Sequence, residues 1–254
     1  MRYRIGLLVG LGLGLAVAAQ AQFQEQRYRL SPAELAELTA GRDRLATALR
    51  RLSDQSARTG RPRPEQLPDA EIYLDAVDRN LRQKLFFAAN DVAHARKCLA
   101  EGEARAASLA KGEAPWGKQT GFVTLGYRSK VDGSVQPYQV YVPSKYFAES
   151  RRPVRLDIFL HGRGGTLNEL NFLTSTAWTN SYFGTSDLPN LTLYPYGRGN
   201  NGWRWAGERD LHEALADVQR RYHVDEDQIT LRGFSMGGHG TWHHGLQHPG
   251  KWAV

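Results

Sequence analysis

The serine in Gly233-Phe234-Ser235-Met236-Gly237 has the setting in this chain that best fits covalent chemistry. The pentapeptide has the pattern G-x-S-x-G, follows a short apolar run and leads into a segment that reads as a helix. In a strand–turn–helix context the two glycines allow a tight turn that exposes the serine hydroxyl, and the next backbone N–H can stabilise an oxyanion. The pattern predicts Ser235 as a nucleophile, Met236 as an oxyanion donor, and Gly233 and Gly237 as residues that the turn requires.

A second glycine-rich loop, His161-Gly162-Arg163-Gly164-Gly165, follows another predicted strand. Glycines allow a backbone to approach a developing negative charge closely. The backbone N–H of Arg163 or of Gly164 would be the second oxyanion donor, and one such donor is worth about 2.7–4 kcal/mol in the transition state. Gly162 and Gly165 support the loop. His161 is expected to hold the turn by hydrogen bonding rather than to act as a general base.

Four histidines follow the serine, and their spacing raises the question of a metal. His239 and His243 are four residues apart, and so are His244 and His248, so that each pair could supply two ligands from one helix face. No acidic residue occurs in 234–254. Surface or core histidines are therefore expected, with no metal and no other cofactor.

The segment 115–254 has the alternating pattern of an α/β sheet. A hairpin opens it, with arms at 122–127 and 138–142 joined through Asp132-Gly133. Strands at 154–160, 191–194 and around Ile229 then alternate with helices at 167–173 and 210–222, and Asp225-Glu226-Asp227 reads as a turn. Both glycine-rich motifs follow strands, and ligands bind at that edge of an open α/β sheet.

The segment 22–114 reads as a small helical region. Ser31 and Glu34 form a capping box at the start of one helix, Asp69 is expected to cap a second, and Asn90-Asp91 begins a third. Each helix has one apolar stripe and must pack against something. The prediction is a helical layer on the following domain, and a module that binds a partner or polymer is the alternative.

The first 21 residues read as a signal peptide, with basic Arg2 and Arg4, an apolar core and an Ala19-Gln20-Ala21 cleavage site. Export to the periplasm or the medium is expected, rather than a membrane anchor, because the apolar run is shorter than the ~20 residues of a spanning helix. The formal charge is +7, or +5 without those two arginines, and the basic residues are scattered. This favours a solvated surface over nucleic-acid binding. Cys98 is the single cysteine, so no intrachain disulfide can form.

The part from Asp157 onward resembles the secreted α/β-hydrolase esterases and the prolyl oligopeptidase-type peptidases. The resemblance rests on Leu160-His161-Gly162-x-Gly164-Gly165, Tyr194-Pro195-x-Gly197-Arg198-Gly199, Gly207-Glu208-x-Asp210, and Gly233 to Trp242. It implies a serine hydrolase acting on a small molecule, a polysaccharide ester or a peptide. The peptidases of this group usually carry a propeller domain, and the sequence shows no propeller repeats. An ester is therefore favoured over a peptide as the substrate. Trp203, Trp205 and Tyr196 could stack on a sugar, although core packing is the expected use.

The resemblance also implies a triad acid and histidine after later strands. Nineteen residues follow Ser235, and the predicted helix after the turn at 233–237, here called the elbow, takes them up. We therefore expect an incomplete α/β-hydrolase sheet, the N-terminal half of a catalytic domain, from a longer gene product, with the elbow strand as an exposed edge. The alternative is a protein that binds without turnover on a hydrolase scaffold. The oligomeric state is left open.

Overall fold

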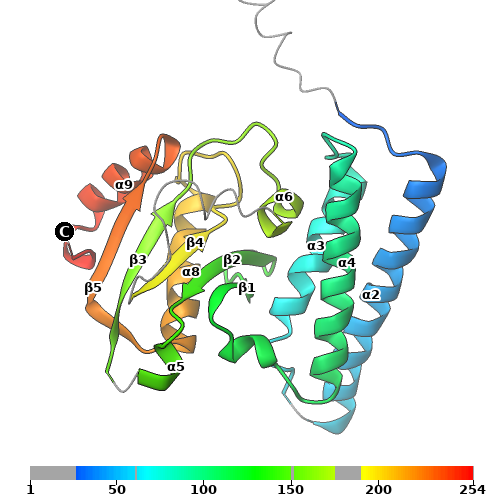
Figure 1. The fold of residues 1–254 in the computed structure, drawn as a ribbon, viewed down its shortest axis with the longest axis horizontal. Helices are drawn as coiled ribbons and strands as arrows, with labels where there is room; N and C mark the ends of the chain where they lie inside the picture. The colour runs from blue at the N-terminus through cyan, green and yellow to red at the C-terminus, as the bar shows by residue number, and fades with distance from the viewer. Residues whose placement is uncertain (1–26, 61, 150–151, 175–189, 254) are drawn as a thin grey trace, which may run out of the picture.

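The computed structural model describes residues 27–60, 62–149, 152–174 and 190–253, so the predicted signal peptide lies outside the described residues. A five-stranded sheet lies beside a layer of three long helices (Figure 1). The strand order is β1-β2-β4-β3-β5, with the bounds β1 Gly121–Arg128, β2 Val135–Val142, β3 Val154–Leu160, β4 Leu191–Pro195 and β5 Val224–Gly233. The predicted α/β class is confirmed.

The opening hairpin is confirmed in its strands and its turn. β1 and β2 pair antiparallel, with Leu125 opposite Tyr138, and β2 continues the sheet by pairing antiparallel with β4. β3 is parallel to β4 on one side and to β5 on the other. Ile158 and Leu160 of β3 are completely buried, as expected for a parallel strand that helices cover.

β5 begins earlier than the sequence indicates. The predicted turn at Asp225-Glu226-Asp227 is wrong, because these residues lie within β5 as an irregularity between Val224 and Ile229. Val154 and Leu156 of β3 pair with Val224 and Ile229, so the extra β5 residues bulge out of the ladder. The acidic side chains do form the local hydrogen bond that is typical of a turn, because the Asp227 N–H donates to Asp225 Oδ1 at 3.1 Å. The chain nevertheless stays beside β3.

The crossover helices position the site. α6 (Glu169–Thr174) follows β3, α8 (Ala206–Arg221) precedes β5, and α9 (Met236–Gln247) follows it. α8 contacts β4 and β1, whereas α9 contacts β5 and β3. Three short elements complete the described part, namely α5 (Tyr146–Glu149) and the 3-10 turns η1 (Pro115–Lys118) and η2 (Pro249–Lys251).

The helical layer consists of α2 (Pro32–Thr59), α3 (Pro68–Gln83) and α4 (Asn90–Ala110). The capping box is confirmed: the Glu34 N–H donates to Ser31 Oγ, and the Ser31 N–H donates to Glu34 Oε2 at 2.8 Å. Asp69, however, does not cap α3, whose N-cap residue is Leu67. Its carboxylate is completely buried and accepts from Trp116 Nε1 and the Gly126 N–H, each at 2.8 Å.

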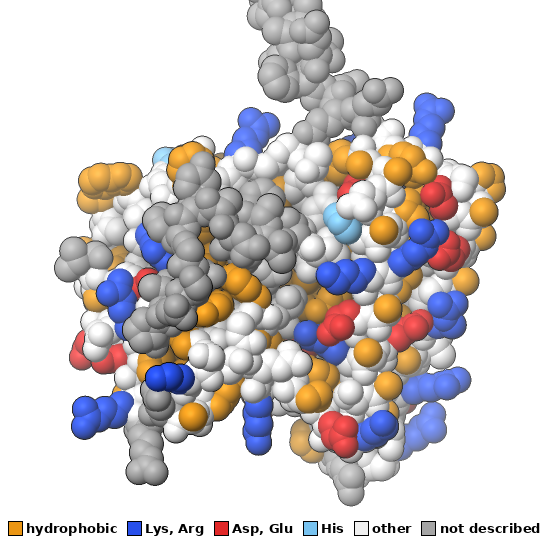
Figure 2. All heavy atoms as spheres, in the orientation of Figure 1, with side chains coloured by type: hydrophobic (Ala, Val, Ile, Leu, Met, Phe, Trp, Pro, Cys, Tyr) orange, Lys and Arg blue, Asp and Glu red, His pale blue; other side chains and the backbone are white. Residues whose placement is uncertain are grey.

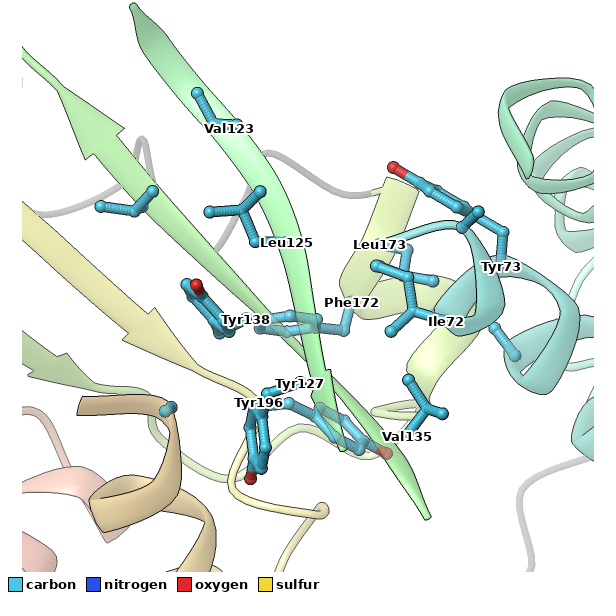
Figure 3. Packing of buried hydrophobic residues seen from close by; sticks show 14 of the residues in the cluster. Ile72, Tyr73, Val123, Leu125, Tyr127, Val135, Tyr138, Phe172, Leu173 and Tyr196 are labelled. Atoms are coloured by element: carbon cyan, nitrogen blue, oxygen red, sulfur yellow. The ribbon is translucent and has the colours of Figure 1, made fainter. Parts of the chain in front are cut away.

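The layer packs on the hairpin and shares its hydrophobic core. Ile72 and Tyr73 of α3 face Leu125 and the neighbouring β1 residues in Figure 3. The approach is close, because a Cβ on Gly126 would lie 2.6 Å from Ile72 Cγ2. The prediction that the helices pack on the domain behind them agrees with this contact.

The surface carries both signs of charge. Figure 2 shows basic and acidic side chains interspersed over the helical layer and over the strand side of the same face. This mixture agrees with the interpretation of the basic residues as a solvated surface. None of the described helices is long and apolar enough to span a bilayer.

Candidate active site

Ser235 occupies a sharp turn between β5 and α9. Its φ and ψ are 53° and −115°, a combination that is rare outside glycine, and the residue is exposed. Such strain persists only where the surroundings enforce it, and it often marks a functional site. The turn points a hydroxyl outward at the start of a helix, as the sequence pattern predicts.

The glycines around Ser235 are required by packing. A Cβ on Gly233 would lie 2.3 Å from the carbonyl oxygen of Gly237, and one on Gly237 would lie 1.8 Å from that of Leu160. Both distances are impossible for a real side chain without a backbone shift. The elbow therefore packs directly on the end of β3.

The loop after β3 lies against this elbow. A Cβ on Gly162 would lie 3.3 Å from the Phe234 carbonyl oxygen and 3.4 Å from Ser235 Cβ. The structure thus brings the two predicted motifs together, although they are far apart in the chain. Arg163 and Gly165, farther along the loop, are exposed.

His161 anchors the loop. It is 3% exposed, with Nδ1 2.8 Å from the Gly162 carbonyl oxygen and Nε2 2.8 Å from that of Tyr196. Burial lowers the pKa of the imidazole. Because both ring nitrogens face carbonyl oxygens, His161 holds the turn and is not placed to accept a proton from Ser235, in line with the expectation from sequence.

Asn200 forms hydrogen bonds with one of the two candidate oxyanion donors of this loop, Gly164. The Gly164 N–H donates to Asn200 Oδ1 at 3.1 Å, and Asn200 Nδ2 donates to the Gly164 carbonyl oxygen at 2.6 Å. The Gly164 N–H is therefore engaged, which leaves the Arg163 N–H as the remaining candidate for the second donor. Sequence reasoning missed Asn200, whose only signal is its place in a glycine-rich loop after a strand.

Asp210 fixes the loop that carries Asn200. It is completely buried, accepts from the Gly197 N–H at 2.6 Å and accepts from the Tyr127 hydroxyl. Burial raises the pKa of Asp210 to about 6, against the hydrogen bonds from Tyr127 and Gly197. Arg198 follows with φ 55° and pairs with Asp132 at 2.6 Å.

Trp203 connects the same loop to α9. It is completely buried, and its Nε1–H donates to the His161 carbonyl oxygen at 3.1 Å. Its ring and Cβ occupy the space that side chains at Gly197 and Gly240 would need, at 2.7 Å in each case. Tyr196 is also buried, so core packing is the use of both residues, whereas Trp205 is 76% exposed.

Within the described residues, no side chain forms a hydrogen bond with the Ser235 hydroxyl. His239 lies on the first turn of α9, and its backbone N–H donates to the Ser235 carbonyl oxygen. The later histidines follow the helix away from the elbow. The described part thus places the candidate nucleophile beside the loop that carries the candidate oxyanion donors, and no general base among the described residues contacts the serine hydroxyl.

An acidic side chain from another helix lies close to the histidines of α9. The sequence segment 234–254 lacks an acid, yet Glu208 of α8 lies within ion-pair distance of His243 and His248, at 3.6 and 3.7 Å. An acid therefore does lie beside these histidines, contrary to the expectation drawn from 234–254 alone. The sequence motif includes Glu208 but does not place it beside these histidines, because it lies on a different helix.

A hollow elsewhere in the described part is lined by Tyr28, Leu81 and Phe86, together with basic Arg27 and Lys84. It belongs to the helical layer and not to the elbow. The chemistry of Ser235 therefore does not depend on it.

No protein-family model and no curated protein sequence matches the chain. Among solved structures it is similar to a thermostable esterase (25% identity, 52% of this chain and 39% of that one, TM-score 0.41). It is also similar to a ferulic acid esterase (22% identity, 53% of this chain and 58% of that one, TM-score 0.41). A third similar structure is the fluorophosphonate-binding serine hydrolase F of Staphylococcus aureus (20% identity, 53% of this chain and 55% of that one, TM-score 0.40). The chain spans between 39% and 58% of these structures. Each is an esterase or a serine hydrolase, the class that the sequence motifs resemble.

Proposed function

We propose that this chain is part of an exported serine hydrolase that cleaves ester or peptide bonds through an acyl-enzyme on Ser235. The observation that carries the proposal is the strained, exposed Ser235 turn, with φ 53°, packed against the Gly162 loop. A serine in ordinary helix or strand geometry would not need two flanking glycines. The close approach of Gly162 to the Ser235 turn supports a site in which the serine hydroxyl would lie near the backbone N–H groups of both loops.

In the proposed reaction, Ser235 Oγ bonds to the substrate carbonyl carbon while its proton passes to a general base. The carbonyl oxygen becomes an oxyanion, which the N–H groups of Met236 and Arg163 stabilise. Collapse of this intermediate expels the alcohol or amine, which takes the proton back from the base. A water molecule then repeats the sequence at the acyl group and releases the acid.

The base and its acid are proposed to come from residues that continue the sheet beyond β5. Within the described residues β5 pairs on one side only, with β3. On the other side, the Ala253 N–H donates to the Ile229 carbonyl oxygen at 2.7 Å, which is the contact a further strand would make. A reading frame that continues with an Asp and a His supports this arrangement, whereas a natural stop codon directly after Val254 contradicts it.

An ester is the proposed substrate rather than a peptide. The three solved structures named above include two whose names describe them as esterases. Trp205 at the start of α8 is exposed, and Phe234, next to the nucleophile, is 52% exposed. These two apolar side chains would suit an aromatic or sugar-bearing ester better than a threaded polypeptide.

A fluorophosphonate probe on the purified chain tests the nucleophile. Labelling that disappears in Ser235→Ala but remains in Ser53→Ala, a control in α2 far from the elbow, would support an activated serine. The chain with its continuation should label faster than the 254-residue chain, because the base would then be present.

A binding protein on a hydrolase scaffold is the second candidate. It is favoured by one observation, the lack of a hydrogen bond to the Ser235 hydroxyl from any residue in the described ranges. Absence of labelling in a sample shown to be folded by circular dichroism, both with and without the continuation, would establish this candidate and overturn the first.

A further inference from the structure

Five side chains gather where the first turn of α8 meets the end of α9. Glu208 and His212 come from α8, whereas His243 and His244 lie on α9 and His248 directly follows it. Glu208 belongs to two possible ligand sets, one with His243 and His244 and one with His212 and His248. Within each set the ligand atoms lie within 4.8 Å of one another.

His244 is built as a metal ligand would be. It is completely buried, and its Nε2 lies 3.0 Å from the Trp203 carbonyl oxygen, to which it can donate. Its Nδ1 is buried and has no hydrogen-bond partner among the described residues. Donation from Nε2 leaves the Nδ1 lone pair available, and metal-bound histidines commonly use the other ring N–H in this way. A buried, unsatisfied nitrogen is otherwise costly.

Glu208 provides the negative charge of the cluster. Its Oε2 lies 3.6 Å from His243 Nε2, close to the ~3.4 Å between two tetrahedral ligands that each lie about 2.1 Å from a zinc ion. The other carboxylate oxygen of Glu208, Oε1, lies 3.7 Å from His248 Nε2, so the acid faces imidazoles on both sides. A deprotonated carboxylate and neutral imidazoles are the forms of these side chains that bind a metal.

The second set is less suited to a cation. Lys251 Nζ lies 2.9 Å from His212 Nδ1, and burial together with the charge of Lys251 lowers the pKa of His212 to about 4. A lysine ammonium beside this histidine would repel a metal ion. Within the described residues, no lysine or arginine forms an ion pair or side-chain hydrogen bond with Glu208, His243 or His244.

We propose that Glu208, His243 and His244 bind one divalent transition-metal ion of the zinc class, with the fourth position open to water. One carboxylate and two imidazoles are ligands that zinc accepts. His243 is eight residues after Ser235, about 12 Å along the helix, so the ion does not reach the reacting atoms. Its role is to clamp α9 to α8 and, through His244 and Trp203, to the loop beside His161. This inference does not depend on the proposed catalytic function.

Metal binding is tested on the full chain without a histidine tag, after removal of metal by a chelator. Titration with Zn²⁺ should show one site by calorimetry, and Co²⁺ should give visible d–d absorption. At about 100 times Kd, zinc should raise the Tm by roughly 5–10 °C. Absence of any binding by the folded, metal-free chain would overturn the proposal.

Variants decide which residues hold the ion. Glu208→Gln and His243→Gln, both only half-buried, should weaken zinc binding roughly 100-fold. His239→Gln, one turn earlier on α9, and His212→Gln, in the second ligand set, should bind as the parent does. Unchanged affinity in the first two variants, or loss in His212→Gln alone, would contradict the assignment. His244→Gln is the direct test only if its circular dichroism shows a folded chain.

Discussion

Ser235 is held in an unfavourable backbone conformation by its neighbours. Its φ of 53° costs of order 1–3 kcal/mol in a non-glycine residue. The compensation comes from the packing of Gly237 on the Leu160 carbonyl oxygen and of Gly233 on Gly237, contacts that any side chain would prevent. The elbow is therefore sensitive at its glycines more than at the serine itself.

Gly237→Ala should damage the elbow, and Gly238→Ala should not. The new Cβ at 237 would overlap the Leu160 carbonyl oxygen at 1.8 Å, whereas the nearest atom to one at 238 is 3.5 Å away. We expect a loss of about 3 kcal/mol or more in the free energy of unfolding for the first. The second should be neutral or gain about 0.5–1 kcal/mol as a helix residue. Urea unfolding measures both, and equal effects would contradict this account of the turn.

Asp210 should make stability fall as the pH rises through the acid range. Its pKa is raised by burial from 3.8 to about 6 in the folded chain, so the folded state holds the proton more tightly than the unfolded state. The resulting stability is complete below about pH 4 and is lost by about pH 6. At 1.36 kcal/mol per pKa unit the loss is about 3 kcal/mol.

Asp210→Asn isolates this contribution, because the amide resembles the protonated acid. The stability of the variant relative to the parent should increase by about 3 kcal/mol between pH 4 and pH 7. Parallel pH profiles of the two proteins in urea unfolding would show that Asp210 does not titrate as described.

Elements with strong local signals could be predicted from the sequence. In three places a few neighbouring residues determine the local structure. These are the capping box at Ser31, the hairpin at Asp132-Gly133 and the strand–turn–helix around Ser235. Asp69 shows where this reasoning fails. An acid at a helix start favours a cap, but here buried donors from Trp116, Gly126 and Arg221 compete for it and prevail.

Asp69 should therefore be the residue that couples α3 to the sheet. Asp69→Ala would remove the carboxylate that lies 2.9 and 3.0 Å from the Arg221 guanidinium, which keeps only Asp217 as an acidic partner. It would also leave the buried N–H groups of Trp116 and Gly126 without their acceptor. Breaking a buried pair in this way costs about 3–5 kcal/mol. Thermal unfolding should show the loss, whereas Glu37→Ala, which removes an exposed partner of Arg96, should change little. Similar small effects in both would mean that the layer docks by apolar packing alone.

At the scale of the whole molecule, the sequence indicates the motifs but not which side chains meet. The Gly162 loop and the elbow could be paired because both follow strands of one sheet. The contact of Asn200 with Gly164 and the position of Glu208 beside His243 could not be predicted in this way. Each contact joins two segments that are far apart in the chain, and no sequence pattern relates those segments. The proposed metal clamp and the proposed oxyanion loop therefore both depend on contacts that form only in the tertiary fold.

The helical layer and the sheet should unfold in one transition. One hydrophobic cluster runs from Leu38 in α2 to Ile229 in β5, and the buried Asp69 joins the two parts. A chain of this length can unfold in steps when its parts have separate cores. Because both parts share this cluster, far-UV circular dichroism, dominated by the long helices, should share a midpoint with tryptophan fluorescence, to which buried Trp203 contributes. Asp69→Ala should lower both midpoints together. Helical signal that persists after Trp203 becomes exposed would instead show that residues 27–112 form an independent folding unit.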